Sequence, residues 1–367
     1  MSRASLPARL RAELAALRIP GCSLAVVERG GRVWAAGFGT ADLAAGRAAT
    51  AETSYHLFSL TKLVTAAAVM QLAEAGTLSL ADPLAAYLPS HPAFARITLR
   101  HLLSHTSGLK DTLAAMLAVH FAGDPTIDSG AALARYRIVA RRPPGRKVEY
   151  RNINYALLGE VVSRVARRPF TDYVAERILA PLGMKVTFSA LAEAGPEAAT
   201  GYMGAWEPMR YFFKLRFPQA ARRLFRARSG GLVALAPYDV DSAAIGGLCG
   251  PVTGFLPFVR AQLRGGEGVL GEASTALMQS CVARGRAGVE SRLGVGLGWK
   301  IGAAGGRRFL NHEGGGAGFT AEARIYPQEG LGMVIAMNRL VGMRSCSLAH
   351  RLGEALCDAR DGLFERA

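Results

Sequence analysis

Several features that would mark a particular class of protein are rare or absent in this sequence of 367 residues. Its five cysteines are scattered and include no C-x-x-C pair, which argues against a zinc ribbon or a disulfide framework and favours a reducing compartment. No apolar run approaches the roughly 20 residues of a membrane span. The segment from Met1 to Arg18 carries several charges and no apolar region of the kind found in signal peptides. We therefore expect a cytoplasmic protein.

Lysine and acidic residues are also scarce. Lysine and arginine together number 44, against 28 acidic residues, and the net charge of +16 comes mainly from arginine. No helix-turn-helix, zinc-finger or RNP signature accompanies this charge, so we expect no nucleic-acid partner. The sequence has no G-x-S-x-G motif and no G-x-x-x-x-G-K-[ST] loop, which argues against an α/β-hydrolase and against a P-loop nucleotide-binding protein.

Apolar residues make up 50% of the chain and charged residues 20%, which is typical of a folded globular protein. Their spacing predicts strands towards both ends of the chain and helices between them. The expected strands are 23–28, 33–38, 297–301, 307–311, 320–326 and 331–338. The expected helices include one near the N-terminus, with Leu6, Leu10, Leu14 and Leu17 on one face, and helices over 59–75, 155–165 and 345–358.

This order of elements predicts an α+β fold. The strands at the two ends of the chain would form one antiparallel β-sheet flanked by helices, with a mostly helical subdomain inserted between them. We expect a single catalytic domain over 1–367. Its sheet subdomain would cover about 1–75 and 240–367, and its helical subdomain about 76–239.

The first candidate for chemistry is the S-x-x-K sequence from Ser59 to Lys62. If Ser59 begins a helix, Lys62 lies one turn later on the same face, where its amine can reach the serine hydroxyl. Burial and the helix N-terminus lower the pKa of such a lysine, so that a neutral amine can take the serine proton. In a second copy, from Ser107 to Lys110, the serine is followed at once by Gly108. A helix cap with a solvated lysine is the alternative interpretation of either copy.

Two further motifs favour the catalytic interpretation. Tyr150 and Asn152 form a Y-x-N sequence before a predicted helix, and a tyrosine hydroxyl near a serine–lysine pair can shuttle a proton. The segment from His312 to Phe319 contains four glycines between predicted strands, and glycine lets a backbone N–H approach a substrate closely. Alone, either motif has a structural explanation, as a helix cap or as a hairpin turn. Their order and spacing together favour an active site.

These motifs resemble those of the serine β-lactamase and penicillin-binding-protein superfamily, in particular its class C-like branch, which includes family VIII carboxylesterases. The resemblance spans most of the chain. The segment from Leu102 to Leu109 is similar to a hallmark of that branch, which explains the second S-x-x-K sequence and the H-x-x-x-H pair of His101 and His105 as structural.

The resemblance implies a role for each site residue. Ser59 is similar to the acylated nucleophile, and Lys62 and Tyr150 to the base system that moves its proton. Asn152 is similar to the residue that holds the lysine and the acyl side chain. His312 takes the place of the lysine of the third motif, followed by Gly314 and Gly315, and the N–H groups of Ser59 and Gly315 are similar to an oxyanion hole.

The implied function is that of a serine hydrolase that needs neither a cofactor nor a metal ion. We expect a small-molecule ester or related acyl substrate, as for a carboxylesterase. Glu313 replaces the usual Thr or Ser, and we expect its negative charge beside a neutral His312 to oppose anionic substrates. A β-lactamase or D-Ala-D-Ala carboxypeptidase is the alternative within the same fold, and a non-catalytic binding or regulatory protein is the second alternative.

One segment suggests a further partner. Residues 209–228 contain seven basic residues and five aromatic residues but no acidic residue. Basic side chains are attracted to anionic lipid, and aromatic side chains enter the membrane interface. We expect this segment to form a flap near the mouth of the active site and to touch an anionic membrane or an amphiphilic substrate. The alternative is that its aromatic residues pack within the helical subdomain.

Overall fold

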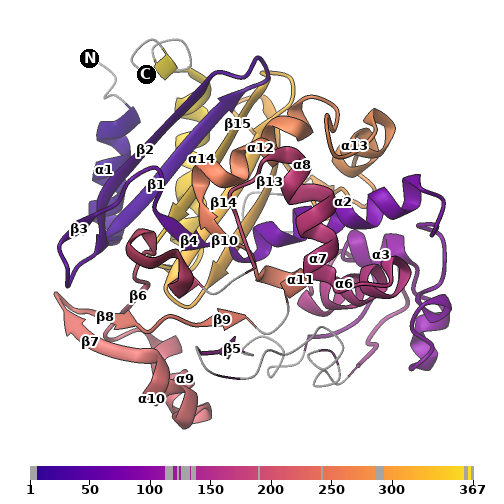
Figure 1. Ribbon diagram of the computed structural model, residues 1–367, viewed down its shortest axis with the longest axis horizontal. Coiled ribbons are helices and arrows are strands. Elements are labelled where there is room, and N and C mark those ends of the chain that lie inside the picture. Colours follow the sequence, from indigo (N-terminus) through magenta and orange to yellow (C-terminus); the bar gives the residue numbers. More distant parts are fainter. Residues whose placement is uncertain are drawn as a thin grey trace.

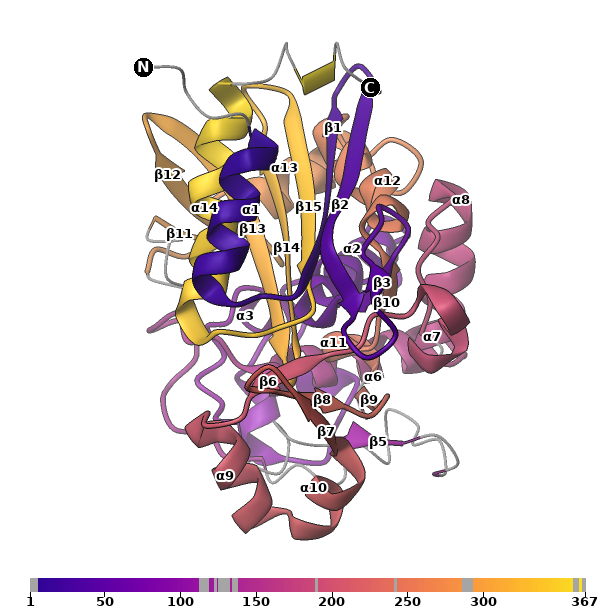
Figure 2. The same cartoon turned by 90° about the vertical axis from the view of Figure 1, so that its left-hand side faces the viewer.

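The computed structural model describes residues 6–111, 119–121, 124, 133, 138–188, 191–240, 243–285, 293–358 and 363–364. Among these residues, no helix combines the length and the apolar character needed to cross a membrane. The protein is built around one large sheet with helices on both of its faces (Figure 1). A mainly helical region lies beyond one end of the strands (Figure 2).

The large sheet has eight antiparallel strands, and strands from the two ends of the chain meet within it. Their order is β11-β12-β13-β14-β15-β1-β2-β3. β1 pairs with β15, and Leu24 lies opposite Ile335, which confirms the sheet predicted from the sequence. The strands are β1 (Gly21–Glu28), β2 (Val33–Asp42), β3 (Arg47–Ala48), β11 (Gly294–Val295), β12 (Lys300–Ala304), β13 (Arg307–Gly316), β14 (Phe319–Tyr326) and β15 (Leu331–Met337).

Helices α1, α12 and α14 cover the sheet, while α2, α3, α6, α7 and α11 pack together beyond it. Their bounds are α1 (Leu6–Leu17), α2 (Thr61–Glu74), α3 (Leu99–Leu103), α6 (Asn152–Ala166), α7 (Phe170–Val174), α8 (Ala180–Leu182), α9 (Pro208–Arg216), α10 (Pro218–Leu224), α11 (Ala243–Gly246), α12 (Val252–Leu263), α13 (Glu272–Gln279) and α14 (Gly342–Asp358). The 3₁₀ turns are η1 (Phe58–Leu60), η2 (Leu84–Ala86), η3 (Pro92–Ala95) and η5 (Leu191–Glu197), and a π-helical turn, η4 (Ala175–Leu179), joins α7 to α8.

Both faces of the central strands are buried, which explains their continuous apolar sequences. On β1, Leu24 and Val26 face a cluster formed with α1 and α14, whereas Ala25 and Val27 face the cluster that contains α12. Successive side chains of a strand point to opposite faces, so a strand covered on both sides has no polar positions that alternate with apolar ones. Figure 2 shows α1 and α14 side by side over one face of the sheet.

The structure corrects some of the predicted boundaries. The helix expected to start at Ser59 begins with the 3₁₀ turn η1 and continues as α2. The strand expected at 297–301 is displaced, because Gly298 turns the chain with a φ of +87° between β11 and β12. β13 extends to Gly316, so the glycine-rich motif lies mostly within a strand rather than in a turn.

The inserted region also contains strands that were not expected. A three-stranded sheet, ordered β6-β8-β7, supports α9 and α10 at the lower edge of the molecule in Figure 1. Two strand pairs, β4 with β10 and β5 with β9, join distant parts of the chain. The bounds are β4 (Ser54–His56), β5 (Val119–His120), β6 (Tyr202–Gly204), β7 (Phe225–Ser229), β8 (Leu232–Leu235), β9 (Asp239–Val240) and β10 (Cys249–Pro251).

Candidate active site

Ser59 lies at the centre of the strained turn η1, immediately before α2. Its neighbour Phe58 has a φ of +47°, in the left-handed region that bulky side chains rarely occupy. The Thr61 hydroxyl donates a hydrogen bond of 2.7 Å to the Phe58 carbonyl oxygen and holds the turn closed. Strain of this kind persists only where the surrounding structure enforces it, and it is concentrated at functional sites.

The structure brings three of the predicted residues together on one atom. Ser59 Oγ lies 2.7 Å from Lys62 Nζ and 2.8 Å from the Tyr150 hydroxyl oxygen. Lys62 comes from the first turn of α2, while Tyr150 is 91 residues away along the chain, just before α6. The serine hydroxyl therefore has an amine and a phenol within hydrogen-bonding distance.

The Lys62 side chain is completely buried. Besides Ser59, its amine contacts the Ile245 carbonyl oxygen on α11, at 2.7 Å. Burial lowers the pKa of Lys62 well below its ordinary value, and the charge of Lys300 lowers it further, against an opposing effect of Asp111. Desolvation disfavours the ammonium form, so the site favours a neutral amine that can accept a proton.

Tyr150 has the opposite protonation tendency. Burial raises the pKa of its phenol well above the ordinary value, although the hydrogen bond with Ser59 opposes this effect. The ring lies between two imidazoles, with centroid distances of 4.6 Å to His105 and 5.9 Å to His312. Because burial favours the neutral phenol, Tyr150 is a proton donor in this site.

Asn152 is close to this group but does not make the expected contact with Lys62. It is the first residue of α6, and its backbone N–H and that of Ile153 donate to the Asp111 carboxylate, each at 2.9 Å. Its side-chain Oδ1 is buried without a hydrogen-bond partner among the described residues. The Ile245 carbonyl oxygen occupies the position beside the lysine amine that Asn152 was predicted to occupy.

The glycines of β13 allow this strand to cross η1 at very short range. A Cβ atom on Gly314 would lie 2.2 Å from the Leu57 carbonyl oxygen and 3.1 Å from the Ser59 nitrogen. On Gly316, a Cβ atom would lie 2.3 Å from the Phe58 ring. Gly315 has more space, since the nearest atom to its Cβ position is a Leu340 methyl at 3.5 Å. Gly314 and Gly316 therefore set how closely β13 can approach the serine.

His312 lies on β13 and is fully buried. Burial lowers its pKa well below the ordinary value, and the nearby Lys300 charge lowers it further, so the imidazole is neutral. Its Nδ1 lies 2.9 Å from the Glu313 carbonyl oxygen, which identifies Nδ1 as the protonated nitrogen. Its Nε2 has no partner among the described residues.

The expected free negative charge at Glu313 is not found. Its carboxylate forms a hydrogen-bonded ion pair with Lys300 of β12, and both side chains are only 10% exposed. Burial alone would raise the pKa of Glu313, but the charge and hydrogen bond of Lys300 leave this pKa below its ordinary value. Lys300 Nζ also lies 4.8 Å from the centroid of the Tyr150 ring. The pair therefore adds balanced charges, not a net negative charge, beside Tyr150.

Lys300 was not among the site residues predicted from the sequence. The pairing of the expected strands could have indicated this role. β12 and β13 place Lys300 opposite Asn311, which is two positions from Glu313 along β13. The shifted boundary of the expected strand at 297–301 concealed that register. Asp111 was missed as well, although it follows Lys110 directly and caps α6.

The second S-x-x-K sequence has a structural role. The Ser107 hydroxyl is 1% exposed and donates a hydrogen bond of 2.6 Å to Asn154 Oδ1. The His101 side chain and Thr98 form a reciprocal cap at the start of α3. His105 Nδ1 accepts from the Arg151 N–H at 3.2 Å and its ring packs against Tyr150. The structural interpretation of this segment agrees with these contacts.

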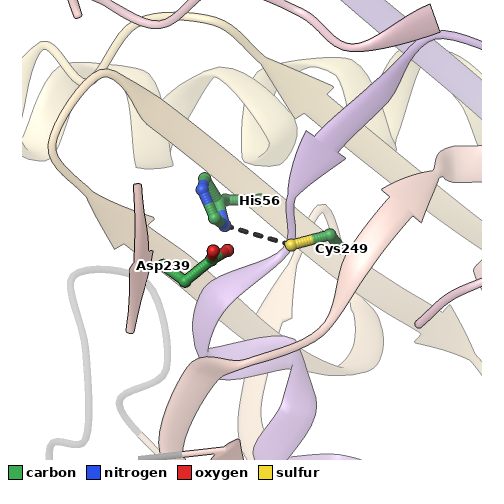
Figure 3. A group of neighbouring side chains, drawn as sticks. All are labelled: His56, Asp239 and Cys249. Carbon is green, nitrogen blue, oxygen red and sulfur yellow. Dashed lines mark hydrogen bonds between the residues drawn. The ribbon is translucent and has the colours of Figure 1, made fainter. Parts of the chain in front are cut away.

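A separate group of side chains has the composition of a metal site. His56, Asp239 and Cys249 offer ligand atoms that lie within 4.8 Å of one another (Figure 3). However, His56 Nε2 donates to the Tyr238 carbonyl oxygen at 2.7 Å, and Nδ1 lies 3.2 Å from Cys249 Sγ. Burial lowers the pKa of His56 to about 4 and raises that of the Cys249 thiol. A neutral thiol donating to a neutral imidazole satisfies His56 and Cys249 without a cation, and links β4 to β10.

Comparisons with known proteins identify curated relatives that match about half of this chain. Putative penicillin-binding protein PbpX of Bacillus subtilis (strain 168) is 32% identical over 179 residues, which cover 48% of this chain and 44% of that protein. Protein flp of Staphylococcus aureus (strain MW2) is 30% identical over 190 residues, which cover 50% of this chain and 38% of that protein. The chain therefore matches less than half the length of these curated relatives.

Solved structures share the fold over nearly the whole chain. The octameric penicillin-binding protein homologue from Pyrococcus abyssi has a TM-score of 0.75 at 25% identity, with 95% of this chain and 77% of that chain covered. The D-amino acid amidase from Ochrobactrum anthropi SV3, complexed with L-phenylalanine, has a TM-score of 0.79 at 21% identity, with 97% and 99% covered. The family model described as Beta-lactamase matches residues 6–356, and this chain belongs to that family.

Proposed function

We propose that this protein is a serine hydrolase that cleaves an ester or related acyl bond through an acyl-enzyme on Ser59. The observation that carries the proposal is the pair of contacts on Ser59 Oγ, from Lys62 Nζ at 2.7 Å and from the Tyr150 hydroxyl at 2.8 Å. An activated nucleophile needs a base within this distance. The opposite pKa shifts of the two partners divide their roles into base and acid.

In the proposed acylation step, Ser59 Oγ attacks the substrate carbonyl carbon while its proton moves to the neutral Lys62 amine. The tetrahedral intermediate collapses with cleavage of the bond to the leaving oxygen. Tyr150 gives its proton to that oxygen and recovers one from the Lys62 ammonium. Water then attacks the carbonyl carbon of the acyl-serine and loses a proton to the Lys62 amine. The ester bond to Ser59 breaks, Ser59 Oγ takes a proton back from the Lys62 ammonium, and a carboxylic acid is released.

The negative charge that develops on the carbonyl oxygen needs donors close to the serine. The backbone N–H groups of Ser59 and Gly315 are the proposed donors. The short approach of β13 to η1 at Gly314 supports this assignment, because the strand can come close to the serine only where it has no side chain. Asn152 Oδ1, which has no partner among the described residues, is available to a donor on the acyl part of the substrate.

The charges around Tyr150 favour a neutral substrate. His312 is neutral, and the Lys300 charge is already paired with Glu313. A substrate carboxylate would have to compete with Glu313 for Lys300, whereas a neutral ester would not. We therefore favour a carboxylesterase over a β-lactamase or D-Ala-D-Ala carboxypeptidase. The relatives named as penicillin-binding proteins keep the second function as the alternative.

Labelling with a fluorophosphonate probe tests the nucleophile. We expect the wild type and Ser107→Ala to be labelled and to turn over p-nitrophenyl esters, and Ser59→Ala to do neither. Ester turnover by Ser59→Ala near the wild-type rate would overturn the assignment. Absence of both labelling and turnover in the wild type would favour a non-catalytic binding or regulatory protein.

A substitution at Glu313 tests the substrate preference. We expect the wild type to hydrolyse nitrocefin, an anionic β-lactam, much less efficiently than its best p-nitrophenyl ester. Glu313→Gln frees the positive charge of Lys300 and should raise the ratio of nitrocefin to ester turnover by about tenfold or more, the equivalent of one favourable charge contact. The double variant Glu313→Gln with Lys300→Met is the control and should lose that gain. A wild type that prefers nitrocefin would support the β-lactamase alternative.

A further inference from the structure

Exposed large apolar side chains are concentrated in one short segment of the protein. Seven such residues are exposed in the described part of the chain, and five of them lie between 206 and 215. Leu215 is 87% exposed and Trp206 78%. Monomeric proteins normally scatter such residues singly, and a cluster marks an interaction site. The five are Trp206, Met209, Tyr211, Phe212 and Leu215.

α9 has apolar side chains on both of its faces. Its inner face holds the buried Phe213, whose ring packs against Phe217 and Phe225. Its outer face should be polar on a surface helix, yet Tyr211, Phe212 and Leu215 are exposed there. The expected packing of aromatic residues within the protein is therefore found for the inner face only. Among the described residues, the Tyr211 ring contacts the Arg210 guanidinium of the same helix, at 5.4 Å from the ring centroid.

This apolar face is surrounded by unpaired positive charges. The basic residues of 209–228 include two that are held by the protein: Arg210 is buried, and Arg223 pairs with Asp124 at 2.9 Å. The other five are exposed and form no ion pair with any described residue. They are Lys214, Arg216, Arg222, Arg226 and Arg228. We call these five, together with the five exposed apolar residues, the basic–aromatic surface.

We propose that the basic–aromatic surface docks onto the anionic surface of a lipid bilayer. The combination of exposed aromatic and aliphatic side chains with surrounding cations matches the headgroup region, where apolar groups enter the interface and phosphates meet the cations. α9 has nine residues and would lie in the plane of the membrane, since a span needs about 20.

The surface is also connected to the candidate active site. The surface lies on and around α9, α10 and β7, and β7 is part of the small sheet β6-β8-β7. This sheet adjoins the turn between β13 and β14, where Gly318 packs against Leu235 of β8 and against Gly201. The Tyr238 hydroxyl donates to the Ala317 carbonyl oxygen in the same turn, at 2.6 Å. If α9 and α10 dock onto the membrane, the end of the large sheet that contains the β13–β14 turn would therefore face the membrane.

Co-sedimentation of the full chain with vesicles tests the proposal. We expect the wild type to pellet with vesicles of 70% phosphatidylcholine and 30% phosphatidylglycerol in 50 mM NaCl, and not with pure phosphatidylcholine. Binding should fall in 500 mM NaCl, because salt screens the attraction. Absence of binding to the anionic vesicles at low salt would overturn the proposal.

Matched variants separate this surface from the general positive charge of the protein. The patch variant replaces Lys214, Arg216 and Arg222 with Glu, and the control variant replaces the exposed Arg9, Arg96 and Arg260 with Glu. Both change the net charge equally. We expect the patch variant to bind at least about tenfold more weakly and the control variant to bind nearly as the wild type does. Equal losses in the two variants would overturn the proposal.

Trp206 provides a readout in the unmodified protein. It is 78% exposed, whereas Trp299 is fully buried, so insertion into the interface should shift the fluorescence of the wild type to the blue. Trp206→Phe should remove that shift. Loss of self-association in Phe212→Ser with Leu215→Ser, measured by size-exclusion chromatography without lipid, would instead show that a second copy of the chain covers this surface, and would overturn the membrane proposal.

Discussion

At the scale of single residues, the site depends on two groups whose burial has opposite consequences. Desolvation removes the charge from Lys62, because its charged form is the protonated one, and it keeps the proton on Tyr150, because its charged form is the deprotonated one. Both groups are therefore neutral over a wide range of pH. The same desolvation thus prepares a base and an acid on either side of one hydroxyl.

Lys62→Arg should reduce kcat by at least about 10²-fold, nearly as much as Lys62→Ala, because the guanidinium cannot give up its proton at working pH. In the wild type, we expect ester turnover to rise with pH through the lowered pKa of Lys62 and then to stay level, since Tyr150 remains protonated. A pH profile of kcat/KM for the three proteins is the measurement. Substantial rescue by Arg would show that Lys62 acts only through its charge.

The lowered pKa of Lys62 also predicts how stability depends on pH. Between this lowered pKa and the value of about 10.4 in the unfolded chain, the unfolded state binds one more proton than the folded state. The free energy of unfolding should therefore gain about 1.4 kcal/mol per pH unit from this group across that window. Lys62→Met should lack the gain. Urea unfolding of both proteins at several pH values tests this, and parallel pH dependences would contradict it.

The sequence predicted residues of the site whose chemistry lies in their side chains, and missed contacts that depend on the backbone or on strand register. Ser59, Lys62 and Tyr150 form recognisable motifs, and the structure brings them together. The carbonyl oxygen that holds Lys62 belongs to Ile245, whose side chain gives no sign of that role. The pairing of Lys300 with Glu313 depends on the register of β12 and β13.

At the scale of elements, the approach of β13 to η1 depends on two missing side chains. Gly314 faces backbone atoms of Leu57 and Ser59, which cannot move aside without displacing the serine. Gly315 is the next residue, and the nearest atom to its Cβ position is a Leu340 methyl at 3.5 Å, an ordinary van der Waals contact. The two neighbouring glycines therefore differ in what they permit, although the sequence presents them as equivalent members of one run.

Gly314→Ala should lower ester turnover by about 10²-fold or more. A Cβ atom at this position would displace β13 or the serine, and catalysis tolerates only small displacements of the reacting atoms. Gly315→Ala is the matched control, since it keeps its backbone N–H and its Cβ has room. We expect it to retain most of the wild-type kcat. Steady-state kinetics and thermal unfolding of both variants separate a local effect from loss of fold, and equal damage by the two substitutions would contradict this account.

The predicted elements that matched the structure are those with strong apolar patterns. The hairpin of β1 and β2, the long helix α2 and the strands β14 and β15 lie close to the expected ranges. The small sheet of β6, β8 and β7 was missed because its strands are short and β7 is arginine-rich and largely exposed. Pairing with β8 decides its conformation, and no local signal in the sequence of β7 shows that pairing.

At the scale of the whole molecule, the arrangement of the core bears on whether the chain unfolds as one unit. One hydrophobic cluster contains residues of the sheet, such as Ala25 and Val334, together with residues of the helical region, such as Leu157. The outer face of the sheet has its own cluster with α1 and α14. The predicted single domain over 1–367 requires these two clusters to be coupled through the strands that they share.

Leu352→Ala tests that coupling, because Leu352 lies on α14, is 1% exposed and packs in the outer cluster, far along the chain from Ser59. Truncation of a buried leucine costs about 2–5 kcal/mol of unfolding free energy. If the chain is one cooperative unit, urea midpoints measured by tryptophan fluorescence and by loss of ester turnover should fall together. Leu215→Ala, which removes the same atoms from a side chain that is 87% exposed, should leave both midpoints within experimental error. A fall in the fluorescence midpoint alone, with turnover persisting to the wild-type midpoint, would show that the outer layer unfolds separately from the site.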